Sequence, residues 1–170
     1  ALADFHKTHR DIKLNIIGDD KITKQVELSA DIILRPINEH LEGFDKCWYT
    51  SYHLGLYASQ EYLDRMGTPK TAQDLLSHDI LAYGEQEFTY YDDVNWHIKG
   101  RSGLPRLKAI MTINSTTALF NAALNGLGVI SLPKESPLYY KRDLVHVLPE
   151  FKGPVMKTYL CLKKTNNVCT

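Results

Sequence analysis

The stretch from Met111 to Pro133 constrains the fold more than any other part of this chain. It reads as a strand, a helix with a polar start, a glycine stop and a second strand. Asn114 and Ser115 are good helix N-caps because their side-chain oxygens can accept hydrogen bonds from the free amides of a first turn. Gly126 can adopt the left-handed backbone conformation that ends many helices. The order predicts a βαβ unit, whose parallel strands require a sheet covered by other elements.

The composition is that of a globular chain and excludes several classes of function. With 44% hydrophobic and 24% charged residues, the 170-residue chain can bury a core of ordinary size. Its formal net charge is zero, which argues against a nucleic-acid clamp, because such surfaces carry a basic surplus. No apolar run approaches the roughly 20 residues that a membrane span requires, so no membrane partner is expected.

Cysteine usage indicates a reducing compartment. The three cysteines, Cys47, Cys161 and Cys169, are odd in number and scattered along the chain. Free thiols are the better interpretation than a disulfide framework, and they predict a cytoplasmic protein. A redox-sensing cysteine is a minor alternative, because no pair suited to a disulfide switch is evident.

Strand patterns alternate with helical ones along the rest of the chain. The first helix is expected to end near His9 or Arg10, and Gly100 to Pro105 reads as a turn. Alternating or short apolar runs predict strands at 12–17, 30–34, 47–50, 53–59, 79–83, 144–148 and 157–163, with an outer strand at Trp96 and Ile98.

Capping residues mark the starts of further helices. Asp19 or Asp20 is expected to cap a short helix that follows the first strand. Ser59 is expected to cap the next helix, which Gly67 ends. The four residues 71–74 fit a capping box, and the two leucines that follow them, Leu75 and Leu76, are expected to be buried.

Motifs in three parts of the chain, at matching spacing, resemble one known family. The first is the run 30–35, A-D-I-I-L-R, and the second is the block 61–78, E-Y-L-D-R-M-G-T-P-K-T-A-Q-D-L-L-S-H. The third is the block 114–133, N-S-T-T-A-L-F-N-A-A-L-N-G-L-G-V-I-S-L-P. Together they resemble the effector-binding domain of LysR-type transcriptional regulators over nearly the whole chain.

The resemblance implies an α/β fold of the two-lobed, periplasmic-binding-protein-like type 2 class, with a hinge of two crossover strands. Lobe I would comprise residues 1–55 and 157–170, and lobe II residues 56–156. The family's N-terminal winged helix-turn-helix and linker helix, and the first strand of lobe I, are expected to lie outside this stretch. DNA would be contacted only through that N-terminal domain. Homodimers or homotetramers are implied, with residues 2–10 and 116–125 as contact surfaces.

The resemblance also implies a small, anionic effector in a cleft between the lobes, and no cofactor. A helix N-terminus offers free amides suited to a carboxylate, and an arginine can hold one through two hydrogen bonds. The positions expected to line the cleft are Gly18, Asp19, Arg35, Pro36, Tyr57, Ser59, Tyr83, Gly84, Asn114, Ser115, Thr116, Gly128 and Val129.

Each of these positions also has a purely structural explanation. Asn114 and Ser115 could serve only as caps, and Arg35 could be a solvated charge. Tyr83 could do no more than cover the sheet. Gly128 forms a G-x-G with Gly126, but the pair follows a helix rather than preceding one, so a dinucleotide site is not supported.

The sequence gives little support to catalysis or to a metal site. His6 and His9 lie three residues apart but have no carboxylate or thiol at metal-ligand spacing, so surface histidines are the better interpretation. We could assemble no acid–base or nucleophile set, and the chain is not expected to be an enzyme. The main alternative is a solute-binding protein of a transport system, which would share the fold and differ in its partner.

Overall fold

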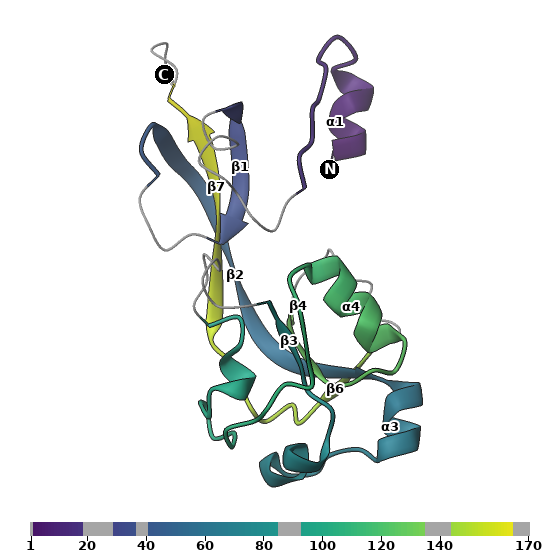
Figure 1. Ribbon diagram of the computed structural model, residues 1–170. Coiled ribbons are helices and arrows are strands. Elements are labelled where there is room, and N and C mark those ends of the chain that lie inside the picture. The colour runs from purple at the N-terminus through teal and green to yellow at the C-terminus, as the bar shows by residue number, and fades with distance from the viewer. Residues whose placement is uncertain (1, 19–28, 37–40, 85–92, 135–143, 165–170) are drawn as a thin grey trace.

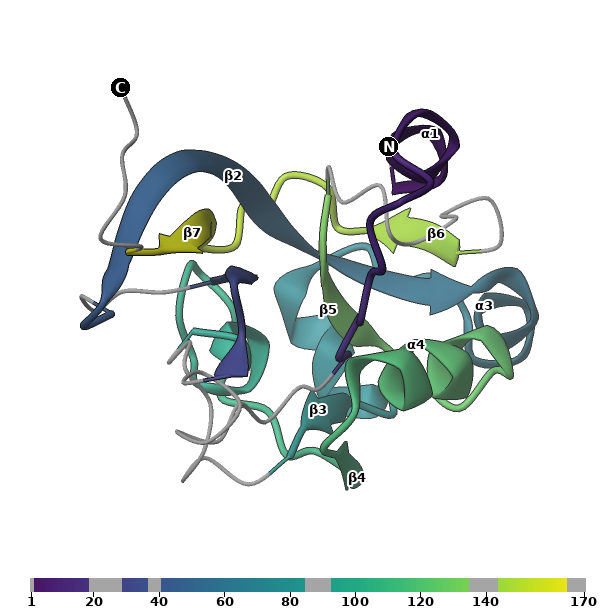
Figure 2. The ribbon, with the colours of Figure 1, turned by 90° about the horizontal axis from the view of Figure 1, so that it is seen from above.

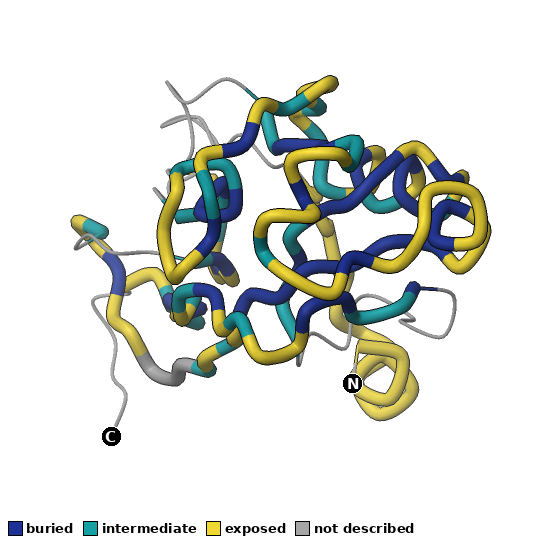
Figure 3. Tube along the Cα trace, turned by 90° about the horizontal axis from the view of Figure 1, so that it is seen from below, coloured by how far each residue is buried: buried dark blue, intermediate teal, exposed yellow. Residues whose placement is uncertain are grey.

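The computed structural model describes residues 2–18, 29–36, 41–84, 93–134 and 144–164, with the backbone alone for 47–49. Figure 1 shows a narrow upper part joined through a neck to a broader lower part. The upper part consists of helix α1 (Leu2–Thr8), strand β1 (Ile32–Pro36) and parts of strand β7 (Val155–Lys163) and strand β2 (Phe44–Ser59), which both continue through the neck. The remaining elements form the lower part, which holds most of the buried residues. Figure 3 shows that buried and exposed stretches alternate along the chain, whereas α1 is exposed throughout.

Strand β2 is one continuous strand that serves both parts of the molecule. Its residues 44–53 pair with β7 in antiparallel fashion, with a register shift between Lys46 and Trp48. Its last residues pair with β5 (Ile130–Pro133) along one edge and with β6 (Leu144–Val147) along the other. The sequence predicted two separate strands here, at 47–50 and 53–59. The structure joins them, so β2 runs through the neck together with β7 (Figure 1).

The upper part has only a small core. Strand β1 pairs with β7, and its inward side chain Ile33 packs with Phe44 and Cys161. The other face of β1 leaves Ile32 and Leu34 each 61% exposed. Cys161 is buried and forms no disulfide with another described residue.

The predicted strand at 12–17 forms no strand pairing within the described residues. Its apolar side chains are exposed, Ile16 to 68%. An extended segment becomes a strand only when a neighbour satisfies its backbone groups, and alternation in the sequence does not supply that neighbour. The short helix expected after Asp19 and Asp20 lies outside the described residues.

The lower part is built on the predicted βαβ unit, with one strand inserted between its two strands. Strand β4 (Met111–Ile113) is followed by α4 (Thr116–Leu124) and then by β5. Strand β3 (Leu81–Tyr83) pairs in parallel with β4, and the parallel bridge between Ile80 and Val129 links it to the start of β5. The carboxyl ends of β3, β4 and β5 therefore lie at one edge of the lower part.

Two apolar clusters cover the two faces of this arrangement. Helix α4 lies over one face (Figure 2), where its Leu119, Ala122 and Ala123 pack on Tyr57 and Leu132. The opposite face packs against α3 (Gln60–Met66) and the short helices η1 (Ala72–Ser77) and η3 (Trp96–Ile98). The buried residues of that cluster include Leu54, Leu56, Ala58, Tyr62, Leu63, Leu75, Ile80, Trp96 and Val129.

Residues 96–98 correct one sequence-based prediction. Trp96 and Ile98 were expected in an outer strand, but they form a turn of 3-10 helix. The Trp96 ring is fully buried, and its indole N–H donates to the Ser131 hydroxyl at 2.8 Å. Gly153 makes room for it, since a β-carbon there would lie 2.6 Å from the ring. Alternation could not distinguish an outer strand from a buried anchor of this size.

The predicted caps of the block 59–78 are confirmed. Ser59 accepts a hydrogen bond from the Tyr62 amide and begins α3, and Gly67 ends it at a φ of 84°. Thr71 and Asp74 form the predicted capping box. Hydrogen bonds from the Lys70 amide and then from the Thr71 amide to the carboxylate lower the pKa of Asp74. The prediction that Leu76 is buried is wrong: it is 58% exposed, whereas Leu75 is 1% exposed.

The Tyr62 hydroxyl links the block 59–78 to the segment that leads into β3, and it should contribute measurably to stability. The hydroxyl accepts the Asp79 amide at 2.7 Å and lies 3.1 Å from Nδ1 of His78. Tyr62→Phe would leave both groups without this partner, so we expect the free energy of unfolding to fall by about 2 kcal/mol in urea titrations. Tyr52→Phe, a half-exposed control, should change it by less than about 0.5 kcal/mol. Equal effects of the two changes would contradict the role given to Tyr62.

Candidate functional site

Polar groups gather where β3 and β4 end. The Gly84 amide donates to the Ile113 carbonyl at 2.9 Å, which extends the parallel pairing by one residue. The Tyr83 hydroxyl donates to the Asn114 carbonyl at 3.2 Å. A β-carbon on Gly84 would lie 3.0 Å from the Asn114 β-carbon, so glycine allows the two turns to touch. The structure therefore brings together three of the predicted positions, Tyr83, Gly84 and Asn114.

Asn95, which was not predicted from the sequence, stabilises this edge through two hydrogen bonds to the Tyr83 backbone. Its carboxamide accepts the Tyr83 amide at 2.9 Å and donates to the Tyr83 carbonyl at 2.7 Å. The side chain is 3% exposed, so both hydrogen bonds are shielded from water. Nothing in the local pattern of residues 93–97 distinguishes this asparagine from one in a solvated loop.

The start of α4 lies at the same edge. Ser115 is the N-cap, and its hydroxyl accepts the Ala118 amide at 3.4 Å. Figure 1 shows that this end of α4 points towards the neck. The first-turn amides and the positive end of the helix dipole can therefore serve an anion there. Thr116 is the first helical residue and is partly buried.

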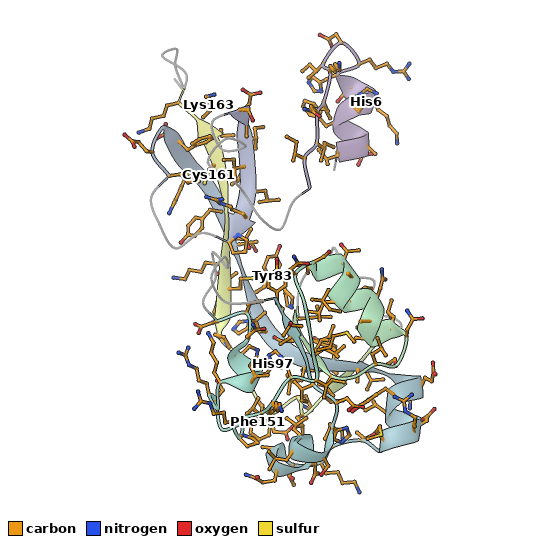
Figure 4. The ribbon with its side chains drawn as sticks, viewed as in Figure 1. His6, Tyr83, His97, Phe151, Cys161 and Lys163 are labelled. Carbon is orange, nitrogen blue, oxygen red and sulfur yellow. The ribbon has the colours of Figure 1, made fainter. Side chains whose placement is uncertain are left out.

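The upper part contributes Arg35 and Pro36, the last two residues of β1. Arg35 is 7% exposed, an unusual degree of burial for a guanidinium. It lies opposite Tyr159 of β7, whose ring is also 4.3 Å from the Lys46 ammonium. In Figures 1 and 4 β1 ends at the neck, and the labelled Tyr83 lies at the top of the lower part. Arg35 and the α4 start thus approach the neck from its two sides.

The hinge strand contributes Tyr57, which is 4% exposed and stacks on His146 with ring centroids 4.9 Å apart. Gly55, two residues before Tyr57 on the same strand, lies under the side chains of His146 from β6 and of Lys134, which follows β5. A β-carbon on Gly55 would be 2.8 Å from Nε2 of His146 and 3.0 Å from Cε of Lys134. Neither His146 nor Lys134 was predicted from the sequence, because their proximity depends on pairing between three strands.

The structure places the remaining predicted positions elsewhere. Ser59 caps α3 at the far end of β2, and its buried side chain serves that helix. Gly128 and Val129 pack against Asp79 and Ile80, at the amino end of β3. Gly18 is exposed, with no other group within 4 Å of a β-carbon placed on it. Asp19 lies outside the described residues.

Among the residues that the structure describes, no three His, Cys, Asp or Glu side chains lie close enough together to hold a metal ion. His6 on α1 and His9, just after its end, are both exposed, and the His9 ring stacks on Phe5. The polar groups that approach the neck include the Arg35 guanidinium and the first-turn amides of α4, all of which can donate hydrogen bonds. Such an arrangement suits the binding of an anionic or polar molecule.

Comparison with known proteins identifies the family. The model of the LysR substrate binding domain matches residues 1–167, almost the entire chain. The chain belongs to the LysR family. Its architecture is the periplasmic-binding-protein-like type 2 fold of LysR regulatory domains, as the resemblance implied.

Relatives of this LysR domain are described as transcriptional regulators. An uncharacterized HTH-type regulator of Haemophilus influenzae is 35% identical over 165 residues, which cover 94% of this chain and 55% of that protein. CrgA of Neisseria meningitidis is 26% identical, with 76% of this chain and 42% of CrgA covered. The chain thus spans about half the length of such relatives. The alternative of a transport solute-binding protein finds no support among them.

Solved structures agree on the fold of the LysR domain. The regulatory domain of CrgA, a LysR-type regulator from Neisseria meningitidis, superposes with a TM-score of 0.79 at 21% identity. The match covers 96% of this chain and 80% of that one. The effector domain of Pseudomonas aeruginosa AmpR gives a TM-score of 0.70 at 17% identity, with 99% and 79% covered. Within the described part of the present chain, no helix is long and apolar enough to cross a membrane.

Proposed function

We propose that this domain senses a small anionic effector bound between its upper and lower parts, as the ligand-responsive portion of a LysR-type transcriptional regulator. The observation that carries the proposal is the burial of Arg35 at the neck end of β1, with the start of α4 pointing towards the same neck. In this proposal, lobe I comprises residues 1–55 and 157–170, and lobe II residues 56–156.

Arg35 and the start of α4 form the two walls of the proposed site, and their chemistry favours a carboxylate or a similar anion. A guanidinium shielded from water attracts an anion more strongly than an exposed one, because the local dielectric constant is lower. Its planar donors match the two oxygens of a carboxylate. The α4 start adds amide donors and the positive end of a helix dipole. An effector with an anionic group and further polar atoms would satisfy both walls.

A ligand that contacts both lobes can change their relative orientation. It shifts the equilibrium only by the difference in its affinity for the open and closed arrangements. The two strands that pass through the neck, β2 and β7, would transmit that change. We further propose that the whole protein is a homodimer or homotetramer that binds DNA through an N-terminal helix-turn-helix domain and acts in the cytoplasm.

A ligand screen followed by charge removal at Arg35 tests this function. Small carboxylates, amino acids and aromatic acids are screened by thermal shift, because a ligand selective for the native state raises the melting temperature. Calorimetry then measures Kd for the best anion. Arg35→Gln should weaken binding about 10- to 100-fold, because a charged hydrogen bond contributes roughly 1.5–3 kcal/mol. Ser115→Asp should also weaken binding, while its carboxylate preserves the N-cap.

The exposed Arg106 provides the matched control. Arg106→Gln removes the same charge from the chain but should leave Kd unchanged within about twofold. If the Arg35 and Arg106 variants bind the anion equally well, the proposed site is wrong. If no compound in the screen raises the melting temperature at millimolar concentration, the sensing function itself is contradicted.

A further inference from the structure

Two side chains capable of carrying positive charge converge over the hinge strand at Gly55. His146 belongs to β6 and Lys134 directly follows β5, and these strands flank β2 on its two edges. A β-carbon on Gly55 would lie 2.8 Å from Nε2 of His146 and 3.0 Å from Cε of Lys134. The glycine therefore leaves the space in which an imidazole nitrogen and a lysine stem meet. Within the described residues, Lys134 forms no ion pair.

The surroundings hold the two groups in a defined geometry. The His146 ring stacks on Tyr57 at an interplanar angle of 19°, which fixes its orientation. The Lys134 amide donates to the His53 carbonyl at 2.6 Å, so its backbone continues the pairing of β5 with β2. Both side chains are partly accessible, whereas Gly55 beneath them is buried. The two side chains are thus positioned in advance: Nε2 of His146 is buried against Gly55, while other atoms of both residues remain partly accessible.

The strand directions place this pair beside the site already described. Strands β3 and β4 are parallel, and the Ile80–Val129 bridge makes β5 parallel to β3. Lys134 therefore follows the carboxyl end of β5, at the edge of the lower part where Gly84 and Asn114 follow β3 and β4. Ligands of parallel α/β sheets bind beyond the carboxyl ends of the strands. The pair thus lies at the edge that would face an effector.

We infer that Lys134 and His146, brought together over Gly55, form a hinge subsite for one anionic group such as a carboxylate or phosphate. Its use by an effector rests on the proposed function, but its affinity for an anion does not. A bound anion would accept hydrogen bonds from the Lys134 ammonium and from the His146 imidazole, which lie at the two edges of β2. The effector class is then one with an anionic group at the hinge, and these residues determine its specificity.

Inorganic phosphate is the probe that tests the subsite on the domain without a known effector. The histidine side-chain resonances of the ¹⁵N-labelled domain are followed as sodium phosphate is added at constant pH and ionic strength. The His146 resonances should shift and saturate, whereas those of the exposed His6 should not. Lys134→Gln should weaken the phosphate affinity about fivefold or more, because it removes the nearest full charge. Lys157→Gln, at an exposed lysine of β7, should leave the affinity unchanged.

Gly55→Ala tests the geometry while keeping both charges. The added methyl would press on the side chains of His146 and Lys134 rather than on backbone atoms, and no positive φ opposes it, so the domain should fold. Its backbone amide spectrum should match the wild type away from the hinge, while phosphate binding should fall at least as much as in Lys134→Gln. A His146 response that stays linear like that of His6, or that survives both substitutions, overturns the subsite.

The two proposals can fail separately. An anionic effector whose affinity depends on Arg35 but not on Lys134 or Gly55 would leave the sensing function intact and remove the hinge subsite from it. Saturable phosphate binding at His146, without any effector from the screen, would support the subsite and contradict the sensing function.

Discussion

Alanine in place of Gly128 is expected to lower the free energy of unfolding by about 3 kcal/mol, at the upper end of what overpacking usually costs. A β-carbon there would lie 2.4 Å from the Asp79 carbonyl oxygen and 3.1 Å from its carbon. Backbone atoms cannot move aside as a flexible side chain can. The two backbone segments would therefore have to separate, which would weaken the hydrogen bond that the Val129 amide donates to the Asp79 carbonyl at 2.8 Å.

Urea unfolding followed by circular dichroism measures this effect, and Gly18→Ala is the matched control. Gly18 has open space around it and no positive φ, so alanine there should change stability by less than about 0.5 kcal/mol. The comparison also separates two explanations of Gly128, since a ligand-contacting glycine would affect binding and leave folding nearly unchanged. A Gly128→Ala domain as stable as the Gly18→Ala domain would contradict the packing role.

Acidification from pH 7 to pH 5 should destabilise the domain by about 2 kcal/mol through His97 alone. The ring is 1% exposed, and burial lowers the pKa of His97 from 6.5 to about 4. Its Nε2 lies 3.0 Å from the Leu81 carbonyl, to which the neutral ring donates. Between pH 6.5 and 4 the unfolded chain binds a proton at this position and the folded chain does not. Stability therefore falls as the pH falls through this window.

Chemical denaturation of the wild type and of His97→Gln at several pH values tests this dependence. Glutamine can still donate to the Leu81 carbonyl but does not titrate, so the variant should lose about 2 kcal/mol less than the wild type between pH 7 and pH 5. A residual slope of the same sign is expected, because burial also lowers the pKa of His78. Parallel stability curves for the two proteins would show that His97 titrates normally in the folded state.

Local signals in the sequence predicted much of the secondary structure of the lower part. The caps at Ser59, Thr71 and Ser115 depend on hydrogen bonds within a few residues, and all three form as predicted. The βαβ order from Met111 to Pro133 is likewise local. The insertion of β3 between β4 and β5 depends instead on contacts between distant segments, which a local pattern does not encode.

The predictions that were wrong depended on local patterns, which tertiary contacts override. Trp96 occupies a 3-10 turn because a fully buried indole outweighs the strand preference of its neighbours. Leu76 is exposed because a short 3-10 helix directs only one of two successive leucines inward. Residues 12–17 alternate as a strand should, but pairing requires a neighbour that the described residues do not supply.

The local residue pattern predicted the candidate site only where one element provides it, whereas Tyr83 and Gly84 were expected through the family resemblance. Asn114 and Ser115 follow from the rule that ligands bind at strand ends and helix starts. Tyr83 and Gly84 join them through a parallel pairing, and Asn95 through a buried side chain, neither of which has a local signature. The proximity of Lys134 and His146 at Gly55 depends on the register of three strands, which no local pattern encodes.

Hydrogen exchange measured with and without an anion that the domain binds tests the central claim most directly, because it reports on both walls of the neck at once. We predict slower exchange of the amides of residues 115–118 in the lower part, together with those of residues 33–35 in the upper part. Arg35→Gln should reduce both effects. Slower exchange confined to one part, or occurring only in segments away from the neck, would contradict an effector bound between the two lobes.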